Sequence, residues 1–102
     1  PVTGQVTLRV VIIGFKHKGL ERFFTRGTKA GIQAQHAARL RLILGALDAA
    51  VYPLDMDLPG LAFHELKGDR TGTWSVKVSG YWRVTFRFMD QDATDVNYED
   101  YH

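Results

Sequence analysis

The sequence contains no cysteine in its 102 residues. This absence excludes disulfide bridges, a thiolate zinc site and a cysteine nucleophile. The chain also lacks any apolar run near the ~18 residues that a membrane-spanning helix needs. Its most apolar stretch, V-T-L-R-V-V-I-I-G-F, is interrupted by Arg9 and lacks the charged start and small-residue exit of a signal peptide. We therefore expect a cytoplasmic protein with no membrane partner.

Proline is scarce, with three residues, and no internal repeat, low-complexity run or Pro/Gly-rich linker divides the chain. A sequence of this length is typical of one domain rather than two. Such a chain buries roughly 60–70% of its unfolded surface, which suffices for one core without covalent cross-links. We expect a single domain over residues 1–102, with residues 1–10 as a possible extension.

The net charge of +2 hides an asymmetry between the two halves of the chain. Residues 1–52 carry eight basic and two acidic side chains, whereas residues 53–102 carry five basic and nine acidic ones. A basic half suggests a polyanionic partner, either nucleic acid or an acidic protein. A solvated helical face explains the same charges, so composition alone leaves both interpretations open.

The first half of the sequence predicts one strand and two helices. A β-branched, apolar run predicts a buried strand within residues 6–15. Apolar residues on one side of L-E-R-F-F-T-R predict a short helix over residues 20–26, which ends at Gly27. Apolar spacings of three and four predict a longer helix over residues 33–51, which ends before Pro53 because a residue preceding proline avoids helical geometry.

The second half changes to a period of two, which is typical of strands. Short turns such as Ser79-Gly80 separate the runs and predict an antiparallel meander. The expected fold class is α+β, in the order β-α-α-β-β-β-β, with two helices packed on one face of a small antiparallel sheet. The four later strands are expected at residues 62–66, 73–78, 81–89 and 93–98.

The same alternation predicts a polar face on the other side of the sheet. Trp82 and its apolar neighbours at every second position point one way, so the side chains between them point the other way. A neighbouring strand and loop add polar residues, and the chain end brings further ones to the sheet edge. The residues expected there are Lys67, Arg70, Ser75, Lys77, Arg83, Thr85, Arg87, Asp100, Tyr101 and His102.

A surface with cations, histidines and a tyrosine suits ribonucleolytic cleavage. That reaction needs a base for the RNA 2′-hydroxyl, fixed cations for the dianionic phosphorane and an acid for the leaving 5′-oxygen. Arginine binds phosphate through its bidentate fork, and histidine exchanges protons near neutral pH. Tyrosine can stack on an unpaired base. The chemistry requires no metal and no other cofactor.

Each of these residues also has a simpler interpretation. Arg83 and Arg87 on an outward sheet face can serve only solubility. Trp74 and Trp82 are expected in the core, and His64 beside an aromatic residue is expected to be half-buried and satisfied.

Two further histidines, His17 and His36, are expected at the surface, although the string K-H-K could contact phosphate. A metal site is disfavoured because its potential ligands have no recognised spacing. Those potential ligands are His64, Asp69, Asp100 and His102.

Four strings then point to one family: I-I-G-F-K-H-K-G-L-E-R-F-F, H-E-L-K-G-D-R-T-G-T-W-S-V, Y-W-R-V-T-F-R-F and the terminal N-Y-E-D-Y-H. Together they resemble the HigB-type plasmid-maintenance killer proteins, toxins of the RelE/ParE superfamily. The resemblance runs from about Val11 to His102 and leaves residues 1–10 outside. It implies a RelE-like fold of a small antiparallel sheet with two helices.

The resemblance also implies a reaction and partners. Such toxins act as mRNA interferases that enter the ribosomal A site and cleave mRNA there without metal, with the 2′-hydroxyl as nucleophile. A cognate, HigA-like antitoxin binds and silences them. The expected partners are therefore an antitoxin, the ribosome and mRNA, and no cofactor is expected.

Carried over by position, the resemblance places active residues at His64, Lys67, Arg83, Asp100, Tyr101 and His102. His102 is expected as the principal acid or base, with His64 as a second proton carrier or positioning group. Arg83 and Lys67 are expected to hold the phosphate, and Tyr101 to position or stack on the nucleotide. We also expect RNA contacts from Lys16, Lys18, Arg70, Lys77 and Arg87.

One position departs from the family pattern. Members often carry arginine where this sequence has Ser79. The missing cation weakens phosphate stabilisation unless Lys77 or Arg87 substitutes, which predicts a slower toxin or a shifted codon preference. Two other functions remain open: a non-catalytic RNA- or ribosome-binding translation blocker, and a ParE-like gyrase inhibitor, which has no use for Tyr101 and His102.

Overall fold

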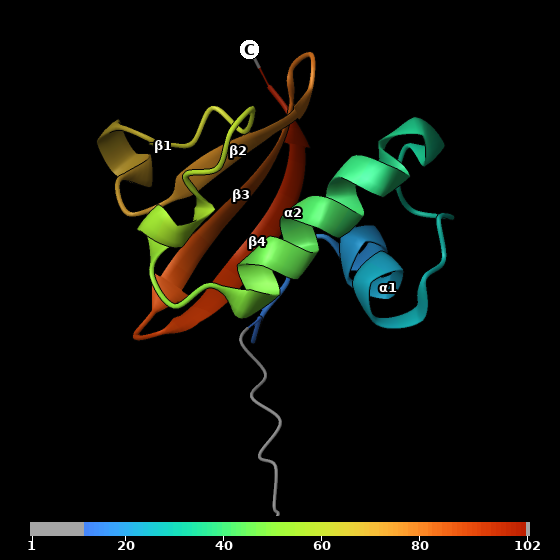
Figure 1. The fold of residues 1–102 in the computed structure, drawn as a ribbon, viewed down its shortest axis with the longest axis horizontal. Coiled ribbons are helices and arrows are strands. Elements are labelled where there is room, and N and C mark those ends of the chain that lie inside the picture. Colours follow the sequence, from blue (N-terminus) through green and yellow to red (C-terminus); the bar gives the residue numbers. More distant parts are fainter. Residues whose placement is uncertain (1–11, 102) are drawn as a thin grey trace, which may run out of the picture.

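A computed structural model describes residues 12–101 of the chain. Two α-helices precede a four-stranded sheet (Figure 1). The helices are α1 (Lys18–Arg26) and α2 (Ala37–Ala49), and the strands are β1 (His64–Glu65), β2 (Trp74–Ser79), β3 (Trp82–Met89) and β4 (Asp92–Asp100). Short 3₁₀ helices lie at η1 (Ala34–His36), η2 (Pro53–Met56) and η3 (Gly68–Arg70). Within this described part, no helix is long and apolar enough to cross a membrane.

The sheet is an antiparallel meander in the order β1-β2-β3-β4, as predicted. The predicted first strand falls mostly on residues outside the described range. Its described end forms isolated parallel bridges with β4, from Ile12 to Ala93 and from Phe15 to Val96. This segment therefore lies beside the last strand, a position that the sequence pattern did not predict.

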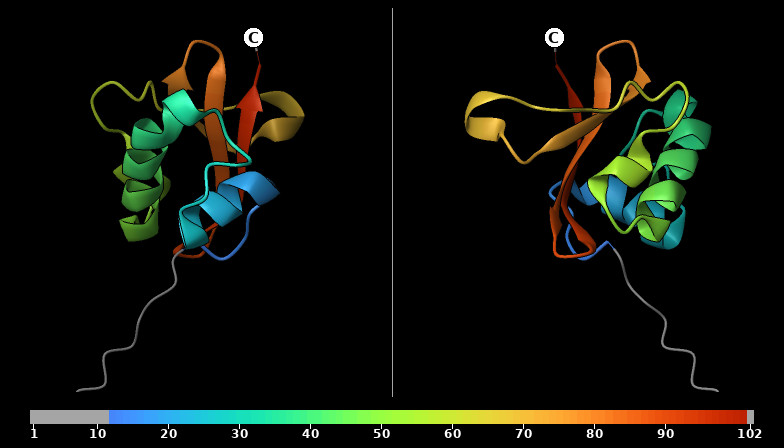
Figure 2. Two further views of the ribbon diagram at one scale, coloured as in Figure 1. Left: turned by 90° about the vertical axis from the view of Figure 1, so that its right-hand side faces the viewer. Right: turned by 60° about the vertical axis from the view of Figure 1, so that its left-hand side comes forward.

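Both helices lie on one side of the sheet and share one hydrophobic core with it (Figure 2). Helix α1 contributes Leu20 and Phe23, and α2 contributes residues at spacings of three and four. These pack with Val84, Phe86 and other buried strand residues. The predicted α+β architecture, with two helices on one face, is confirmed. The buried α2 residues are Ala37, Leu40, Ile43, Leu44 and Leu47.

The two tryptophans lie at the edge of this core, half-buried and packed against it. Trp74 stacks on Phe63 with ring centroids 5.0 Å apart, and Trp82 lies 4.5 Å from the ring of Tyr98. Both were predicted in the core, and the structure places them against it but only half-buried. Tyr98 itself is 5% exposed, so it anchors the last strand to the core.

Two histidines were wrongly expected at the surface. His36 is 6% exposed, and its Nδ1 lies 2.6 Å from the Tyr98 hydroxyl. His17 is half-buried and caps α1, because its Nδ1 accepts a hydrogen bond from the Leu20 N–H at 2.9 Å. Burial is the main cause that lowers the pKa of His17, and Arg22 lowers it further. Both effects favour the neutral ring that can accept this bond.

Element ends differ from the predictions by a few residues. Helix α1 ends as predicted at Gly27, whose φ of 77° is the left-handed geometry that glycine tolerates. Helix α2 ends at Ala49 because Ala50 adopts an extended backbone, so the helix stops before the predicted residue 51. Strand β1 has two residues rather than the five that were predicted.

A bulge in β4 decides which side chains face the core. Thr94 pairs with Arg87 and Asn97 pairs with Thr85, so β4 holds one more residue than β3 between these pairs. Asp95, at the bulge, has a φ of 52°. The extra residue shifts by one position the alternation of inward and outward side chains along β4. As a result, Tyr98 points into the core and Glu99 points away from it.

Candidate functional site

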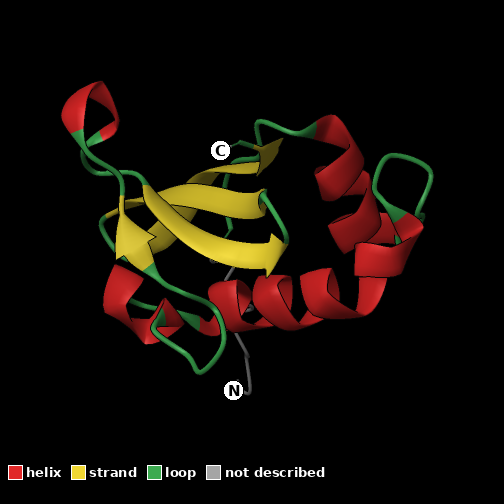
Figure 3. Ribbon diagram, turned by 90° about the horizontal axis from the view of Figure 1, so that it is seen from above, coloured by secondary structure: helices red, strands yellow, loops and turns green. Residues whose placement is uncertain are grey.

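The sheet face turned away from the helices is here named the open face (Figure 2). Strand register places Lys77 opposite Arg83, and Ser75 opposite Thr85. The predicted sharing of this face by residues of β2 and β3 is therefore confirmed. Loop 66–73, which carries η3, projects on this side, opposite α2 (Figure 3). The open face consists of Ser75, Lys77, Arg83, Thr85, Arg87, Thr94, Asn97 and Glu99.

At the chain end, Tyr101 turns back onto the open face. Its backbone N–H donates to the Tyr81 carbonyl oxygen at 3.1 Å, and its hydroxyl lies 2.9 Å from Ser75 Oγ. The Arg83 guanidinium carbon lies 5.8 Å from the centroid of the Tyr101 ring, within cation–π range. Tyr101 therefore lies just past the end of β4, on the polar face where it was expected. His102, expected as the principal proton carrier, lies outside the described residues.

Two backbone carbonyls orient the Arg83 side chain. Its Nη1 donates to the carbonyl oxygens of Gly80, at 2.7 Å, and Trp82, at 3.0 Å. These bonds tie the guanidinium to the β2–β3 turn and leave its other nitrogens without partners among the described residues. Because a guanidinium keeps its proton, this is a fixed positive charge at the sheet edge.

His64 reaches the same region from the other edge of the sheet. It pairs with Ser75 across β1 and β2, and it is exposed rather than half-buried as expected. Its Nδ1 lies 3.0 Å from the carbonyl oxygen of Ala62. Because a carbonyl oxygen only accepts, Nδ1 carries the proton and Nε2 is the basic nitrogen of the neutral ring. His64, Ser75, Arg83 and Tyr101 are here named the terminal cluster.

Three other predicted site residues make no hydrogen bond, ion pair or ring contact with this cluster in the described part of the chain. Lys67 is exposed, directly precedes η3, and its ammonium has no partner among residues 12–101. Lys77 is exposed opposite Arg83. Asp100 is exposed at the end of β4, opposite Trp82.

Arg70 is not a free cation, because it forms a two-pronged ion pair with Glu99. Its Nη1 and Nη2 donate to the two carboxylate oxygens at 3.1 and 2.8 Å. Glu99 also accepts a short hydrogen bond from the hydroxyl of Thr85. Burial raises the pKa of Glu99, but the bonds from Arg70 and Thr85 outweigh it, so the net shift is downward. The carboxylate is therefore held in its charged form.

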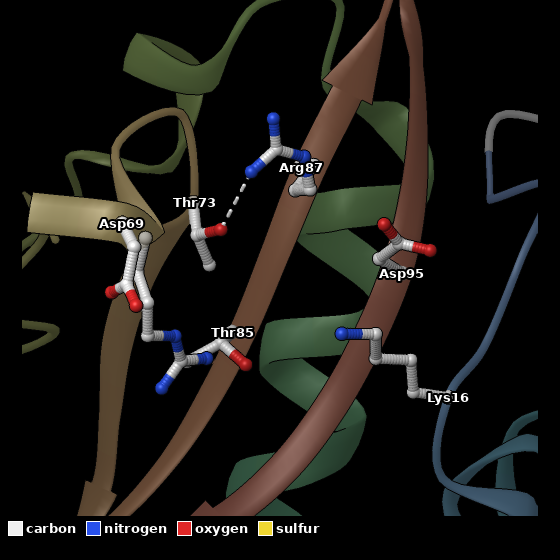
Figure 4. Close-up of a pocket in the computed structure, with 7 residues that line it drawn as sticks. Lys16, Asp69, Thr73, Thr85, Arg87 and Asp95 are labelled. Carbon is white, nitrogen blue, oxygen red and sulfur yellow. Dashed lines mark hydrogen bonds between the residues drawn. The ribbon is translucent and has the colours of Figure 1, made fainter.

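A cavity of about 300 Å³ lies beside this pair (Figure 4). Arg87 donates there to the hydroxyl of Thr73 at 2.9 Å. Of the expected RNA contacts, Lys16, Arg70 and Arg87 line it, whereas Lys18 begins α1 and does not. The lining mixes both charges: Lys16, Asp69, Arg70, Thr73, Thr85, Arg87 and Asp95.

Sequence reasoning missed Glu99, and it placed Ser75 and Thr85 on the polar face without giving either of them a role. Ser75 is 0% and Thr85 1% exposed, although both lie on the polar face. The signal for Glu99 was present, because a residue that follows an inward Tyr98 must point outward. The balance of positive and negative charge on the open face could not be predicted from the sequence, because loop 66–73 and β4 come together only in the folded chain.

A small antiparallel sheet, with helices on one face and cations, a histidine and a tyrosine on the other, places the chain in the class of small α+β proteins with a polar open sheet face. Residues 13–102 match the family of RelE-like toxins of the type II toxin–antitoxin system HigB. The chain belongs to this family, which confirms the resemblance predicted from the sequence. Family membership implies an antitoxin partner.

One curated relative is an endoribonuclease HigB from Proteus vulgaris. It is 44% identical over 92 residues, which cover 90% of this chain and all of the relative. The activity in the relative's name agrees with the ribonucleolytic reaction expected from the sequence.

Proposed function

We propose that this toxin is a ribosome-dependent mRNA endoribonuclease that inhibits translation by cutting mRNA in the A site. The observation that carries the proposal is the terminal cluster, where a fixed arginine lies against a tyrosine ring and a histidine offers a basic Nε2. The Proteus relative, an endoribonuclease by name, supports it. Action on ribosome-bound mRNA places the toxin in the cytoplasm.

The proposed reaction is an internal phosphoryl transfer without metal. The 2′-oxygen attacks phosphorus as its proton passes to a base, and the bond to the 5′-oxygen breaks as that oxygen receives a proton. The products are a 2′,3′-cyclic phosphate and a 5′-hydroxyl. We assign the principal proton transfer to His102 and a second, or a positioning role, to His64, and we keep Asp100, the last residue of β4, as a further member of the site. One residue serves as base and another as acid.

Cations stabilise the negative charge that accumulates on the phosphorane. Arg83 is suited to this task because two carbonyls already fix its direction, so little reorganisation is needed during the reaction. Lys67 supplies a second, more mobile charge. Tyr101 lies against Arg83 and can stack on a base or position the nucleotide. Lys77, opposite Arg83, is the nearest replacement for the family arginine at Ser79.

Mapping of 5′ ends in cellular mRNA after induced expression tests this function. We expect growth arrest and new 5′ ends within codons for the native chain and for Lys29→Ala, an exposed control position in the loop after α1. Arg83→Ala and His102→Ala should lose both effects. Growth arrest without new mRNA ends would instead support a translation blocker that acts by occupancy. If His102→Ala cleaves as fast as the native chain, the assignment of the main proton carrier is wrong.

A further inference from the structure

Loop 66–73 has few connections to the sheet. Within the loop, the Leu66 N–H donates to the Thr73 carbonyl at 2.8 Å, and the Thr73 N–H donates to the Arg70 carbonyl at 2.9 Å. These bonds close the loop, and the Gly72 N–H donates to Glu65 Oε2 of β1 at 2.8 Å, but none of these bonds reaches β3 or β4. Lys67, one of the two phosphate-holding cations proposed above, lies in this loop. The orientation of the loop therefore decides where that charge lies.

Two arginines link the loop to the distant strands. Arg87 donates to Thr73 Oγ1 at 2.9 Å and reaches the Thr71 carbonyl at 3.4 Å. Arg70 spans from the loop to Glu99 on β4 and engages both carboxylate oxygens. The second link is the stronger one, because a bidentate pair of opposite charges adds a second bond and a geometric constraint that a single bond to a hydroxyl lacks.

The surroundings of Glu99 favour a structural role over a chemical one. Its side chain is 19% exposed, against 42% for Arg70, so the carboxylate is the better shielded partner. Both of its oxygens accept hydrogen bonds, Oε1 from Arg70 and Oε2 from Arg70 and Thr85. An oxygen held in this way is a poor proton acceptor. Glu99 engages two of the five N–H donors of Arg70, and its negative charge offsets the positive charge that a phosphate would meet there.

We infer that Glu99 is a positioning residue: by holding the Arg70 guanidinium across the open face, it fixes loop 66–73 and thereby the position of Lys67. The inference rests on the proposed function, because it concerns the placement of a proposed phosphate-holding group. It reassigns Arg70 from the expected RNA contact to an internal link. The loop then presents Lys67 from the same edge of the sheet as His64.

The two roles for Arg70 predict opposite results for Glu99→Gln. If Arg70 binds RNA and Glu99 merely competes for it, the variant frees a cation and lowers KM. If the pair positions the loop, the variant misplaces Lys67, and kcat on mRNA-programmed ribosomes falls on the order of 10- to 100-fold with KM little changed. Asp57→Asn is the control: it removes an exposed carboxylate that is distant from Glu99 in the sequence, and it should match the native rate. Unchanged or faster cleavage by Glu99→Gln would overturn the inference.

A double-mutant cycle tests whether the two residues act as one unit. Glu99→Gln and Arg70→Gln should each slow cleavage, and the double variant should be no slower than the slower single variant, because residues that act through one contact are not additive. Rate losses that multiply in the double variant would show independent roles and contradict the inference.

Amide hydrogen exchange in the isolated chain gives a readout that does not need RNA. In Glu99→Gln, the amides of Leu66, Thr71 and Thr73, which bond within the loop, should exchange at least several-fold faster, and the amide of Val84 should not change. Equal exchange in native and variant chains would overturn the inference. If the native chain cleaves no mRNA, the proposed function fails, and the exchange data still decide whether Glu99 holds the loop.

Discussion

The two ends of the open face carry similar cations in different surroundings. In the terminal cluster, Arg83 is bonded only to carbonyl oxygens and an aromatic ring, and it forms no ion pair with any residue in the range 12–101. In the cavity, Lys16 and Arg87 share the space with Asp69 and Asp95. The Arg70–Glu99 pair joins the two ends, because Arg70 lines the cavity and Glu99 lies opposite Arg83.

This difference indicates that one sheet face can attract a phosphate at one end and not at the other. A phosphate in the cavity meets two aspartates as well as the cations, so the attraction is largely cancelled. At the terminal cluster, the same phosphate meets fixed positive charge. The number of cations on a sheet face therefore says less about phosphate binding than the acids placed among them.

The largest expected effect comes from a matched pair of arginines. Arg83→Ala should lower the cleavage rate on programmed ribosomes on the order of 100- to 1,000-fold, because it removes a preorganised charge at the phosphorane. Arg87→Ala removes the same side chain from the cavity and should cost less than about tenfold, through a looser loop. Single-turnover cleavage rates measure both. Equal losses in the two variants would remove the distinction between the two ends.

Tyr101 gives a second test of the difference between the terminal cluster and the cavity, because no aromatic residue among those described lines the cavity. Tyr101→Ala should weaken the transition-state interaction by about 1–3 kcal/mol through the loss of stacking. Tyr101→Phe keeps the ring and loses only the contact with Ser75 Oγ, so it should remain within about fivefold of the native rate. Values of kcat/KM for the two variants check this. If phenylalanine is as harmful as alanine, the hydroxyl rather than the ring carries the function.

Two lysines provide a test through salt dependence. Lys67→Ala should reduce the slope of log KM against log salt by about 0.7, the value for one phosphate contact on single-stranded RNA. Lys16→Ala should leave that slope unchanged, because aspartates balance its charge in the cavity. Kinetics at several salt concentrations would measure both slopes. A reduced slope for Lys16→Ala would place a phosphate in the cavity instead.

The smallest expected effect concerns the pair between the two ends. Because the folded-state pKa of Glu99 lies below its unfolded value, the pair should stabilise the fold fully above about pH 4.3 and lose that contribution as pH falls through the lower folded-state pKa. Arg70 is well exposed, so solvent limits the stabilisation to about 1 kcal/mol. Denaturant unfolding of the native chain and Glu99→Gln should differ at pH 7 and converge in acid. A constant difference at all pH values would exclude this linkage.

Sequence alternation predicted much of the sheet and its polar face. The period of two in β3 was unambiguous, so the placement of Arg83, Thr85 and Arg87 on one side followed from strand geometry alone. The helices could be predicted equally well, because their apolar residues share one face and Gly27 marks the C-terminal end of α1.

The missed features depend on contacts between distant segments. The bulge at Asp95 lies where β4 pairs with residues 12–15. No local sequence pattern predicts this pairing. His36 is buried because it meets Tyr98, 62 residues further along the chain. The Arg70–Glu99 pair likewise joins segments 29 residues apart, so the charge balance of the face was not predictable from the sequence.

End-group analysis of mRNA cut on programmed ribosomes by the purified toxin tests the central claim most directly. The proposed function predicts cleavage in the A-site codon with 2′,3′-cyclic phosphate and 5′-hydroxyl ends. That cleavage should be lost in Arg83→Ala and retained in Lys16→Ala. Ribosome binding without any cut, or a loss of cleavage in Lys16→Ala as large as in Arg83→Ala, would contradict the assignment of the reaction to the terminal cluster.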